Sequence, residues 1–121
     1  MIGPTEKHEA ARGQDSRRVV THAEPISRSR ETTFDRDLHP RRDWHELAAT
    51  LARLCRQVAA ELRVLGYVGR TVGVKLRYDD FRIATRDLSI AQPTCDERTI
   101  RRLAFECLAR QQATRRIRLI G

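Results

Sequence analysis

The stretch GRTVGVKLRYDDFRIATRDLSI, residues Gly69–Ile90, decides the fold of this chain. Two runs in which apolar and polar residues alternate flank the acidic pair Asp79–Asp80, and this pattern predicts a β-hairpin. With the acidic pair as the loop, three cross-strand pairs share one face: Tyr78–Phe81, Leu76–Ile83 and Val74–Thr85. That face is largely apolar, so we expect it to cover the core of the domain.

The other face of the hairpin gathers cations around two small residues, in the pairs Arg77–Arg82, Lys75–Ala84 and Gly73–Arg86. Like charges directly opposite one another destabilise a ladder. The arrangement is better suited to a face on which an anionic polymer lies, because the small residues let the backbone approach closely. An ordinary solvated sheet face is the alternative.

The charge of the chain favours a nucleic-acid partner. Its 121 residues suit a single domain, and 24 lysines and arginines stand against 16 acidic residues, for a formal net charge of +8. Only Lys7 and Lys75 are lysines, and every other cation is an arginine. The planar guanidinium binds phosphate through two hydrogen bonds at once, so this bias fits nucleic acid. An arginine-rich proteome would produce the same bias.

No feature of the sequence indicates a membrane or an oxidising compartment. The chain has no run of about 18 apolar residues and no signal-peptide core at its N-terminus. Its three cysteines are scattered, and Cys55 and Cys107 fall on apolar helical stripes, as buried small hydrophobes do. We expect a reduced, cytoplasmic setting without disulfides.

The first 24 residues are polar and cannot form a core of their own. Glu6–Gln14 favours a short helix that ends at Gly13, and Ser16–Pro25 is typical of an extended linker. We expect residues 1–24 to be extended or partly disordered and residues 25–121 to form the domain.

Within the domain, a strand at Ser27–Phe34 precedes a long amphipathic helix. The helix begins at the N-cap Asp43, with Glu46 completing a capping box, and ends at Gly66. In the second strand of the hairpin the phase of the apolar residues changes near Arg86–Asp87, which predicts a bulge.

A second helix and a final strand complete the pattern. Thr94 and Glu97 form a second capping box, and Arg115–Ile120 reads as a strand with Ile117 and Leu119 pointing inward. The order β-α-β-β-α-β predicts an α+β, ferredoxin-like fold, in which two right-handed crossovers place both helices on one face of a four-stranded sheet.

The opposite sheet face is then bare, and its residues are hydroxyls and cations. The alternation of side chains predicts Ser27, Ser29, Thr33, Thr71, Gly73, Lys75, Arg77, Arg82, Arg86 and Arg118 on it. Single-strand RNA modules of this topology stack bases on exposed sheet aromatics. Here Phe34, Tyr78 and Phe81 fall on the helix-facing parity, so phosphate contacts are favoured over base stacking.

Catalytic and metal-binding patterns are weak. The pair Asp79–Asp80 and the carboxylates Asp35 and Asp37 suggest metal ligands, but a hairpin loop and a solvated strand end explain them better. The four histidines have no zinc-ligand spacing with a cysteine. We therefore expect no catalytic residue, metal or cofactor in this chain.

Three segments carry a family resemblance: SRETTFDRDL at Ser29–Leu38, the stretch at Gly69–Ile90, and RRIRLIG at Arg115–Gly121. In order and spacing they resemble the little-finger domain of Y-family translesion DNA polymerases, of the bacterial DNA polymerase IV type. The likeness covers about Pro25–Gly121. Ala11–Val20 also resembles the end of the thumb and the tether that lead into that domain.

The resemblance implies a DNA-gripping domain whose sheet lies in the major groove and holds backbone phosphates of template and primer. It also implies contacts with the sliding clamp and a role in translesion synthesis and DNA repair. By position, the residues that match the family's DNA-facing strands are Ser27, Ser29, Arg30, Lys75, Arg77, Thr85 and Arg86. The register derived above points Thr85 inward instead. The palm and fingers, which hold the polymerase carboxylates and Mg²⁺ in the family, are missing, and the last strand ends at Gly121, so the resemblance implies a non-catalytic fragment.

We therefore expect a domain that grips primer–template duplex without sequence preference, through Ser27, Ser29, Arg30, Thr71, Lys75, Arg77, Arg82, Thr85, Arg86 and Arg118. A standalone ferredoxin-like module that binds RNA or protein is the alternative.

Overall fold

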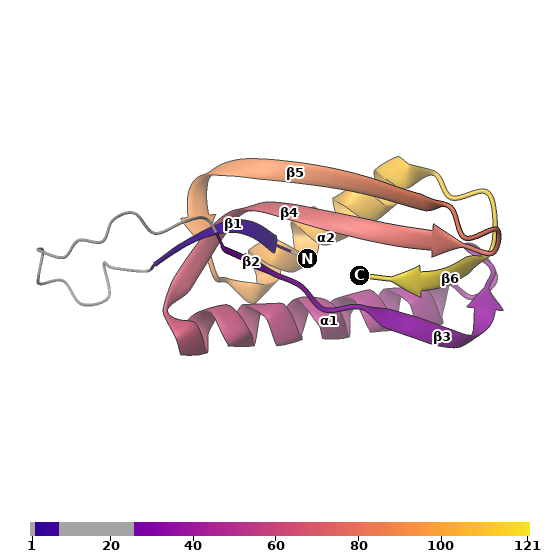
Figure 1. Ribbon diagram of the computed structural model, residues 1–121, viewed down its shortest axis with the longest axis horizontal. Helices are drawn as coiled ribbons and strands as arrows, with labels where there is room; N and C mark the ends of the chain where they lie inside the picture. The colour runs from indigo at the N-terminus through magenta and orange to yellow at the C-terminus, as the bar shows by residue number, and fades with distance from the viewer. Residues whose placement is uncertain (1, 8–25) are drawn as a thin grey trace, which may run out of the picture.

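The computed structural model describes residues 2–7 and 26–121 (Figure 1). Its elements in chain order are β1 (Ile2–Lys7), β2 (Ile26–Arg28), β3 (Thr32–Leu38), α1 (Trp44–Leu65), β4 (Tyr67–Tyr78), β5 (Ile83–Thr94), α2 (Glu97–Gln111) and β6 (Ile117–Ile120). Most of the predicted helix at Glu6–Gln14 and all of the predicted linker at Ser16–Pro25 lie outside the described residues. A helix starting at Glu6 is wrong for Glu6 and Lys7, which belong to β1.

The sheet has the predicted β-α-β-β-α-β core and one added strand. β3, β6, β4 and β5 are neighbours in that order, and every neighbouring pair is antiparallel. β3 and β4 therefore run parallel to each other, and α1 connects them by crossing over β6. The α+β, ferredoxin-like class is confirmed.

The added strand β1 lies end to end with β6 along the same side of β4 (Figure 1). The backbone of Gly121 exchanges two hydrogen bonds with Lys75, of 2.7 and 2.9 Å, and Ile2 then pairs with Val72. β1 also pairs with β2. The predicted strand at Ser27–Phe34 is divided here: β2 ends at Arg28, and β3 begins at Thr32 and continues to Leu38.

Both helices lie on the same side of the sheet, as predicted (Figure 1). The core between helices and sheet is made of fully buried aliphatic side chains, among them Leu47, Leu51, Val58, Leu62, Val72, Val74, Leu76, Ile100, Ile117 and Ile120. Cys55 and Cys107 are free and buried in the same core, which confirms their assignment as buried hydrophobes. Burial raises the pKa of the Cys55 thiol to about 11. Within the described part of the chain, no helix is long and apolar enough to cross a membrane.

The first helix begins and ends where predicted, but its N-terminal cap differs. Asp43 holds the N-cap position without a side-chain hydrogen bond to the helix. Its carboxylate instead accepts hydrogen bonds from the His39 amide at 2.7 Å and from Arg36 at 3.2 Å, and the bond from Arg36 is the main cause that lowers the pKa of Asp43. Glu46 also pairs with Arg36, at 3.3 Å, so the predicted capping box is wrong. Gly66 ends the helix with a left-handed φ of 76°.

The second helix is capped by Asp96 rather than by Thr94. The Asp96 carboxylate accepts hydrogen bonds from the Thr99 amide at 3.0 Å and the Thr99 hydroxyl at 2.8 Å, and these bonds lower the pKa of Asp96. The Thr94 hydroxyl accepts a hydrogen bond from the Asp96 amide at 2.9 Å. Both residue types form caps, and the predicted box of Thr94 and Glu97 is wrong by two residues.

The hairpin is confirmed, but its register differs from the prediction by one residue. Leu76 pairs with Ala84 rather than with Ile83. The loop holds three residues instead of two, because the Tyr78 amide bonds to the Arg82 carbonyl at 2.9 Å and Phe81 closes the loop with a left-handed φ of 69°. Since side chains alternate between faces, a shift of one residue moves every side chain of β5 to the other face.

The shift also removes the predicted bulge near Arg86–Asp87. β5 pairs with β4 without interruption from Ile83 to Ser89, and the irregularity lies between Gly69 and Thr71 on β4. Leu88 and Ile90 pack against the core, whereas Ile83, which the sequence pattern placed inside, is 50% exposed.

A bulge does occur where β6 meets β4, between Arg77 and Tyr78. Ile117 belongs to the core, but Leu119 pairs with Arg77 and with Thr33 and lies on their side of the sheet. The predicted inward position of Leu119 is therefore wrong, although its side chain is buried.

Candidate nucleic-acid interface

The face of the sheet turned away from α1 and α2, which we call the open face, carries the polar residues of β4. Because Val72, Val74 and Leu76 are buried under the helices, the alternate residues Thr71, Gly73, Lys75 and Arg77 lie on the open face. Their partners on β5 share that face and are Ser89, Asp87, Thr85 and Ile83. The Thr71 and Ser89 hydroxyl oxygens are 2.8 Å apart.

Lys75 lies at the centre of the open face. It is paired with Thr85 across the ladder, and its ammonium group donates a 2.9 Å hydrogen bond to the Glu31 carboxylate. The predicted neighbour Ala84 lies on the other face. Thr85 is thus on the open face, in agreement with the position implied by the family resemblance and against the register derived from the hairpin alone.

Arg77 is a cation of the open face that has no acidic partner among the described residues. Its neighbours in the ladders are the aliphatic residues Ile83 and Leu119. Among the described residues, no carboxylate lies within ion-pair distance of Arg77. The predicted opposition of Arg77 and Arg82 is wrong, so no like-charge repulsion exists at this pair.

Arg118 and Phe81 extend the open face to the hairpin end. The Arg118 guanidinium carbon is 4.7 Å from the centroid of the Phe81 ring, and one of its nitrogens is 3.8 Å from Asp37. Phe81 is 59% exposed. The prediction that Phe81 faces the helices is therefore wrong. The open face carries an aromatic ring that the alternation of side chains in the predicted register had assigned to the helix side.

Two of the predicted cations lie elsewhere. Arg86 is directly opposite Val74 in the ladder, so its side chain points to the helix side of the sheet. Its charge acts there on Tyr78, whose pKa burial raises and Arg86 partly lowers again. Arg30 pairs with Glu61 of α1 at 3.7 Å.

The register also moves Arg82 off the open face, because Arg82 lies opposite Tyr78, which packs against the core, so its predicted open-face position is wrong. Arg82 follows the hairpin loop and pairs with Asp80 at 3.6 Å. The other predicted residues lie in β2, in the break before β3 and on β4. Ser27 belongs to β2, and Ser29 is exposed in the break between β2 and β3. Gly73 does not leave an open approach to the backbone, because a Cβ atom added there would collide with the Asp87 carboxylate.

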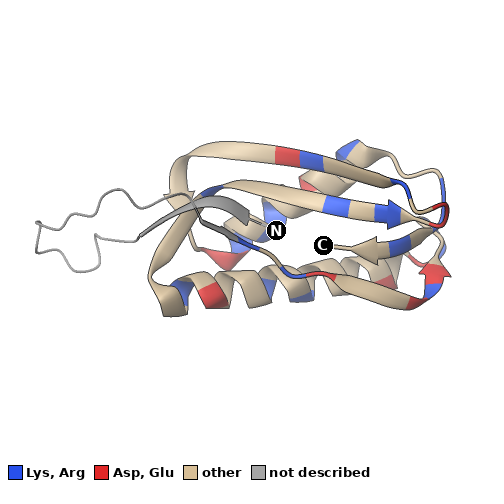
Figure 2. Ribbon diagram, in the orientation of Figure 1, with Lys and Arg blue, Asp and Glu red and all other residues tan. Residues whose placement is uncertain are grey.

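The distribution of charge follows this geometry (Figure 2). Basic residues lie in the second half of β4 and in β6, next to each other in the sheet, whereas acidic residues gather at the hairpin turn and in β3. The turn acids are already paired: Asp79 accepts a 2.8 Å bond from Arg115. Because the turn acids are bound to other basic residues, they do not neutralise Arg77 and Lys75. These two side chains are therefore the cations best placed to bind an anion from another molecule.

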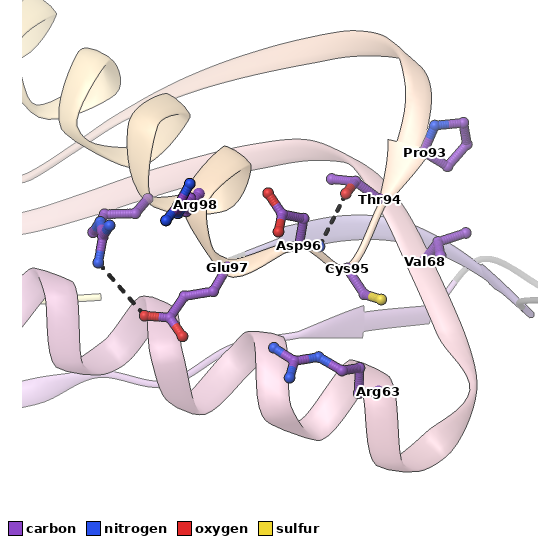
Figure 3. Close-up of a pocket in the computed structure, with 9 residues that line it drawn as sticks. Arg63, Val68, Pro93, Thr94, Cys95, Asp96, Glu97 and Arg98 are labelled. Carbon is purple, nitrogen blue, oxygen red and sulfur yellow. Dashed lines mark hydrogen bonds and ion pairs between the residues drawn. The ribbon is translucent and has the colours of Figure 1, made fainter.

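A cavity of about 740 Å³ lies at the other end of the domain, between the end of α1 and the start of α2 (Figure 3). Cys95 and Arg63 line it, and the Glu97–Arg101 ion pair of 3.5 Å crosses its rim. Among the residues that the structure describes, no group of three or more histidine, cysteine, aspartate or glutamate side chains is placed to hold a metal ion. The cavity brings together none of the predicted site residues.

Comparison with known proteins gives the family. The impB/mucB/samB family C-terminal domain matches residues 25–121. DNA polymerase IV of Caulobacter vibrioides is 42% identical over 114 residues, which cover 94% of this chain and 28% of that protein. DNA polymerase IV of Methanoculleus marisnigri is 41% identical over 114 residues, which cover 94% of this chain and 31% of that protein. The chain spans less than a third of the length of these relatives.

Solved structures agree with this assignment. The little finger domain of PolIV in complex with a beta-clamp processivity factor superposes with a TM-score of 0.58 at 25% identity, covering 76% of this chain and 80% of that one. A post-insertion binary complex of Dbh DNA polymerase, with a TM-score of 0.56 at 16% identity over 82% of this chain and 30% of that one, shows the fold alone. The chain belongs to the impB/mucB/samB C-terminal domains, the little finger domains of Y-family DNA polymerase IV.

Proposed function

We propose that this domain binds duplex DNA without sequence preference, by holding backbone phosphates on the open face of its sheet. The observation that carries the proposal is Arg77, an arginine at the centre of the sheet that faces away from the core and has no acidic partner among the described residues. Lys75 lies two residues away on the same face. Arginine and lysine that hold phosphates fix a protein on DNA but read no sequence.

Hydroxyl groups surround these two cations. Thr71 and Ser89 form one cross-strand pair, and Thr85 lies opposite Lys75. Hydroxyl groups, like cationic side chains, donate hydrogen bonds to phosphate oxygens. The open face therefore offers charged and neutral donors over two adjacent strands, which suits one segment of sugar–phosphate backbone.

Nucleotide addition is not assigned to this chain. The relatives are polymerases about three times its length, and we propose that the polymerase carboxylates and their magnesium lie in the part of such a protein that this chain does not match. The likeness to the little finger domain solved with a beta-clamp favours the sliding clamp as a second partner, which titration calorimetry with a purified clamp would test.

The test of DNA binding is the double variant K75A/R77A, measured on two unrelated primer–template duplexes across a series of salt concentrations. If each residue holds one phosphate, the logarithmic salt slope should flatten by roughly two, at about 0.9 per phosphate. Binding should weaken equally on both sequences. The matched control is Arg102→Ala, which removes an exposed arginine from α2 and should leave the slope unchanged.

An unchanged slope in K75A/R77A would contradict the proposal, and so would a loss of affinity confined to one sequence. Stronger binding to single-stranded RNA than to duplex DNA would favour a standalone RNA-binding module instead.

A further inference from the structure

Phe81 occupies a backbone position that does not suit it. The third residue of a three-residue hairpin loop takes a left-handed conformation, which glycine and asparagine adopt at low cost and bulky residues rarely adopt. Phe81 holds a φ of 69° there. This conformation therefore destabilises the fold, and glycine or asparagine at position 81 would avoid that cost.

The Phe81 side chain does not recover that cost through burial. It is 59% exposed and does not belong to the buried core or to the half-buried residues packed on it. Ile83, two residues further on, is 50% exposed on the open face. Two large apolar side chains thus lie in solvent at one end of the sheet, and strained, exposed residues of this kind occur preferentially at functional sites.

The surroundings of this apolar pair indicate its partner. Arg118 lies over the Phe81 ring at 4.7 Å, and Arg77 is directly opposite Ile83. Three acids nearby are bound to basic side chains: Asp37 to Arg118, Asp79 to Arg115, and Asp80 to both Arg82 and Arg115. A partner that fits must present an anionic group to Arg77 and an apolar surface to Phe81 and Ile83. A nucleotide does so, because its phosphate and its base and sugar are covalently joined.

We infer that Phe81 and Ile83 form an apolar contact with the base or sugar of a nucleotide whose phosphate is held by Arg77. The inference rests on the proposed function, since it adds a second kind of contact to the same face. The contact resembles other uses of exposed aromatic and aliphatic side chains on DNA, which pack on unstacked bases or against the groove edge of paired ones. Arg118 holds the ring in place from one side through its cation–π contact.

The test uses Phe81→Gly, because glycine removes the ring and also relieves the left-handed backbone. The melting temperature should stay equal or rise, whereas DNA affinity should fall by about five- to tenfold. The salt slope should not change, because no phosphate contact is lost. A residue with a merely structural role would give the opposite stability result. Phe81→Tyr keeps the ring and should restore binding.

The matched control is Val64→Ala, which removes an apolar side chain that is 84% exposed on α1 and should not alter affinity. Binding is measured on a blunt duplex, a primer–template with an overhang, and a single strand. A loss on every DNA that includes the blunt duplex assigns the contact to the groove edge of paired nucleotides. A loss only where unpaired bases are present assigns it to an unstacked base.

Equal affinity of Phe81→Gly and wild type on all three DNAs would overturn the inference. The proposed function would still stand if K75A/R77A flattened the salt slope in the same experiment. If K75A/R77A left the slope unchanged, the proposed function itself would fail, whatever Phe81→Gly did.

Discussion

At the scale of single residues, Lys75 and Arg77 differ in what a phosphate must displace. Lys75 is already bonded to Glu31 at 2.9 Å, whereas Arg77 has aliphatic neighbours. An ion pair exposed to solvent contributes about 0–1 kcal/mol, so Glu31 is a weak competitor for the lysine. It nevertheless places a negative charge where a phosphate would lie.

Replacing Glu31 by glutamine should therefore strengthen DNA binding. The charge that competes for Lys75 is lost, and the gain should be about two- to fivefold, since the pair is weak. The measurement is the dissociation constant of a duplex at fixed salt concentration. The control is Glu106→Gln, which breaks the ion pair with Arg110 on α2, also 2.9 Å long. If E31Q bound no more tightly than E106Q, Glu31 would not be competing with DNA.

At the scale of elements, the sequence determines one strand of the site and leaves the other undecided. On β4 the apolar residues Val72, Val74 and Leu76 fix the parity, so the open-face positions of Lys75 and Arg77 could be predicted. On β5 the parity depends on the length of the loop, and a two-residue loop at Asp79–Asp80 agreed with the sequence as well as the three-residue loop does.

The three-residue loop was not predictable because it needs Phe81 in the left-handed region, a conformation that its residue type disfavours. The errors on β5 follow from that one residue, whereas the wrong position of Leu119 follows from the bulge between β6 and β4. Arg86 moves to the helix side, while Thr85 and Ile83 move to the open face. The helices, by contrast, were predictable to within a residue or two, because each has a continuous apolar stripe and the first ends at a glycine.

The cap of α2 can be tested by comparing its two candidate residues. Asp96→Ala removes the acceptor of both Thr99 bonds and should lower the melting temperature by a few degrees at pH 7. Thr94→Ala removes only a bond outside the helix and should cost less. If Thr94→Ala lowered the melting temperature more than Asp96→Ala did, Thr94 would be the cap, as the sequence pattern predicts.

The Asp96→Ala variant also tests how the contribution of the cap to stability depends on pH. The pKa of Asp96 is lowered from its model-peptide value of 3.8 by the Thr99 bonds, so the charged cap stabilises the folded state above that value. The contribution is lost as the pH falls through the lowered pKa. The difference in melting temperature between wild type and Asp96→Ala should therefore shrink in strong acid, and a difference that stayed constant would contradict the charged cap.

At the scale of the whole molecule, the two faces of the sheet have different roles. One face carries the helices and the buried core, which includes Val72, Val74 and Leu76. The polar side chains of the open face, such as Lys75 and Arg77, do not belong to that core, so we expect their replacement to have little effect on folding. β5 lies at the edge of the sheet, and its residues point alternately to the two faces. Neighbouring residues of β5 thus belong to surfaces with different roles.

Arg86 makes this separation testable. The family resemblance assigns it to the DNA-facing strands, whereas the register places it opposite Val74, on the side of the helices. Arg86→Ala removes the same charge as Arg77→Ala from the neighbouring strand of the same sheet. If DNA lies only on the open face, Arg77→Ala should flatten the logarithmic salt slope by about 0.9 and Arg86→Ala should leave it unchanged. Equal flattening by both variants would mean that the DNA reaches around the edge formed by β5, and that the binding surface is wider than the open face.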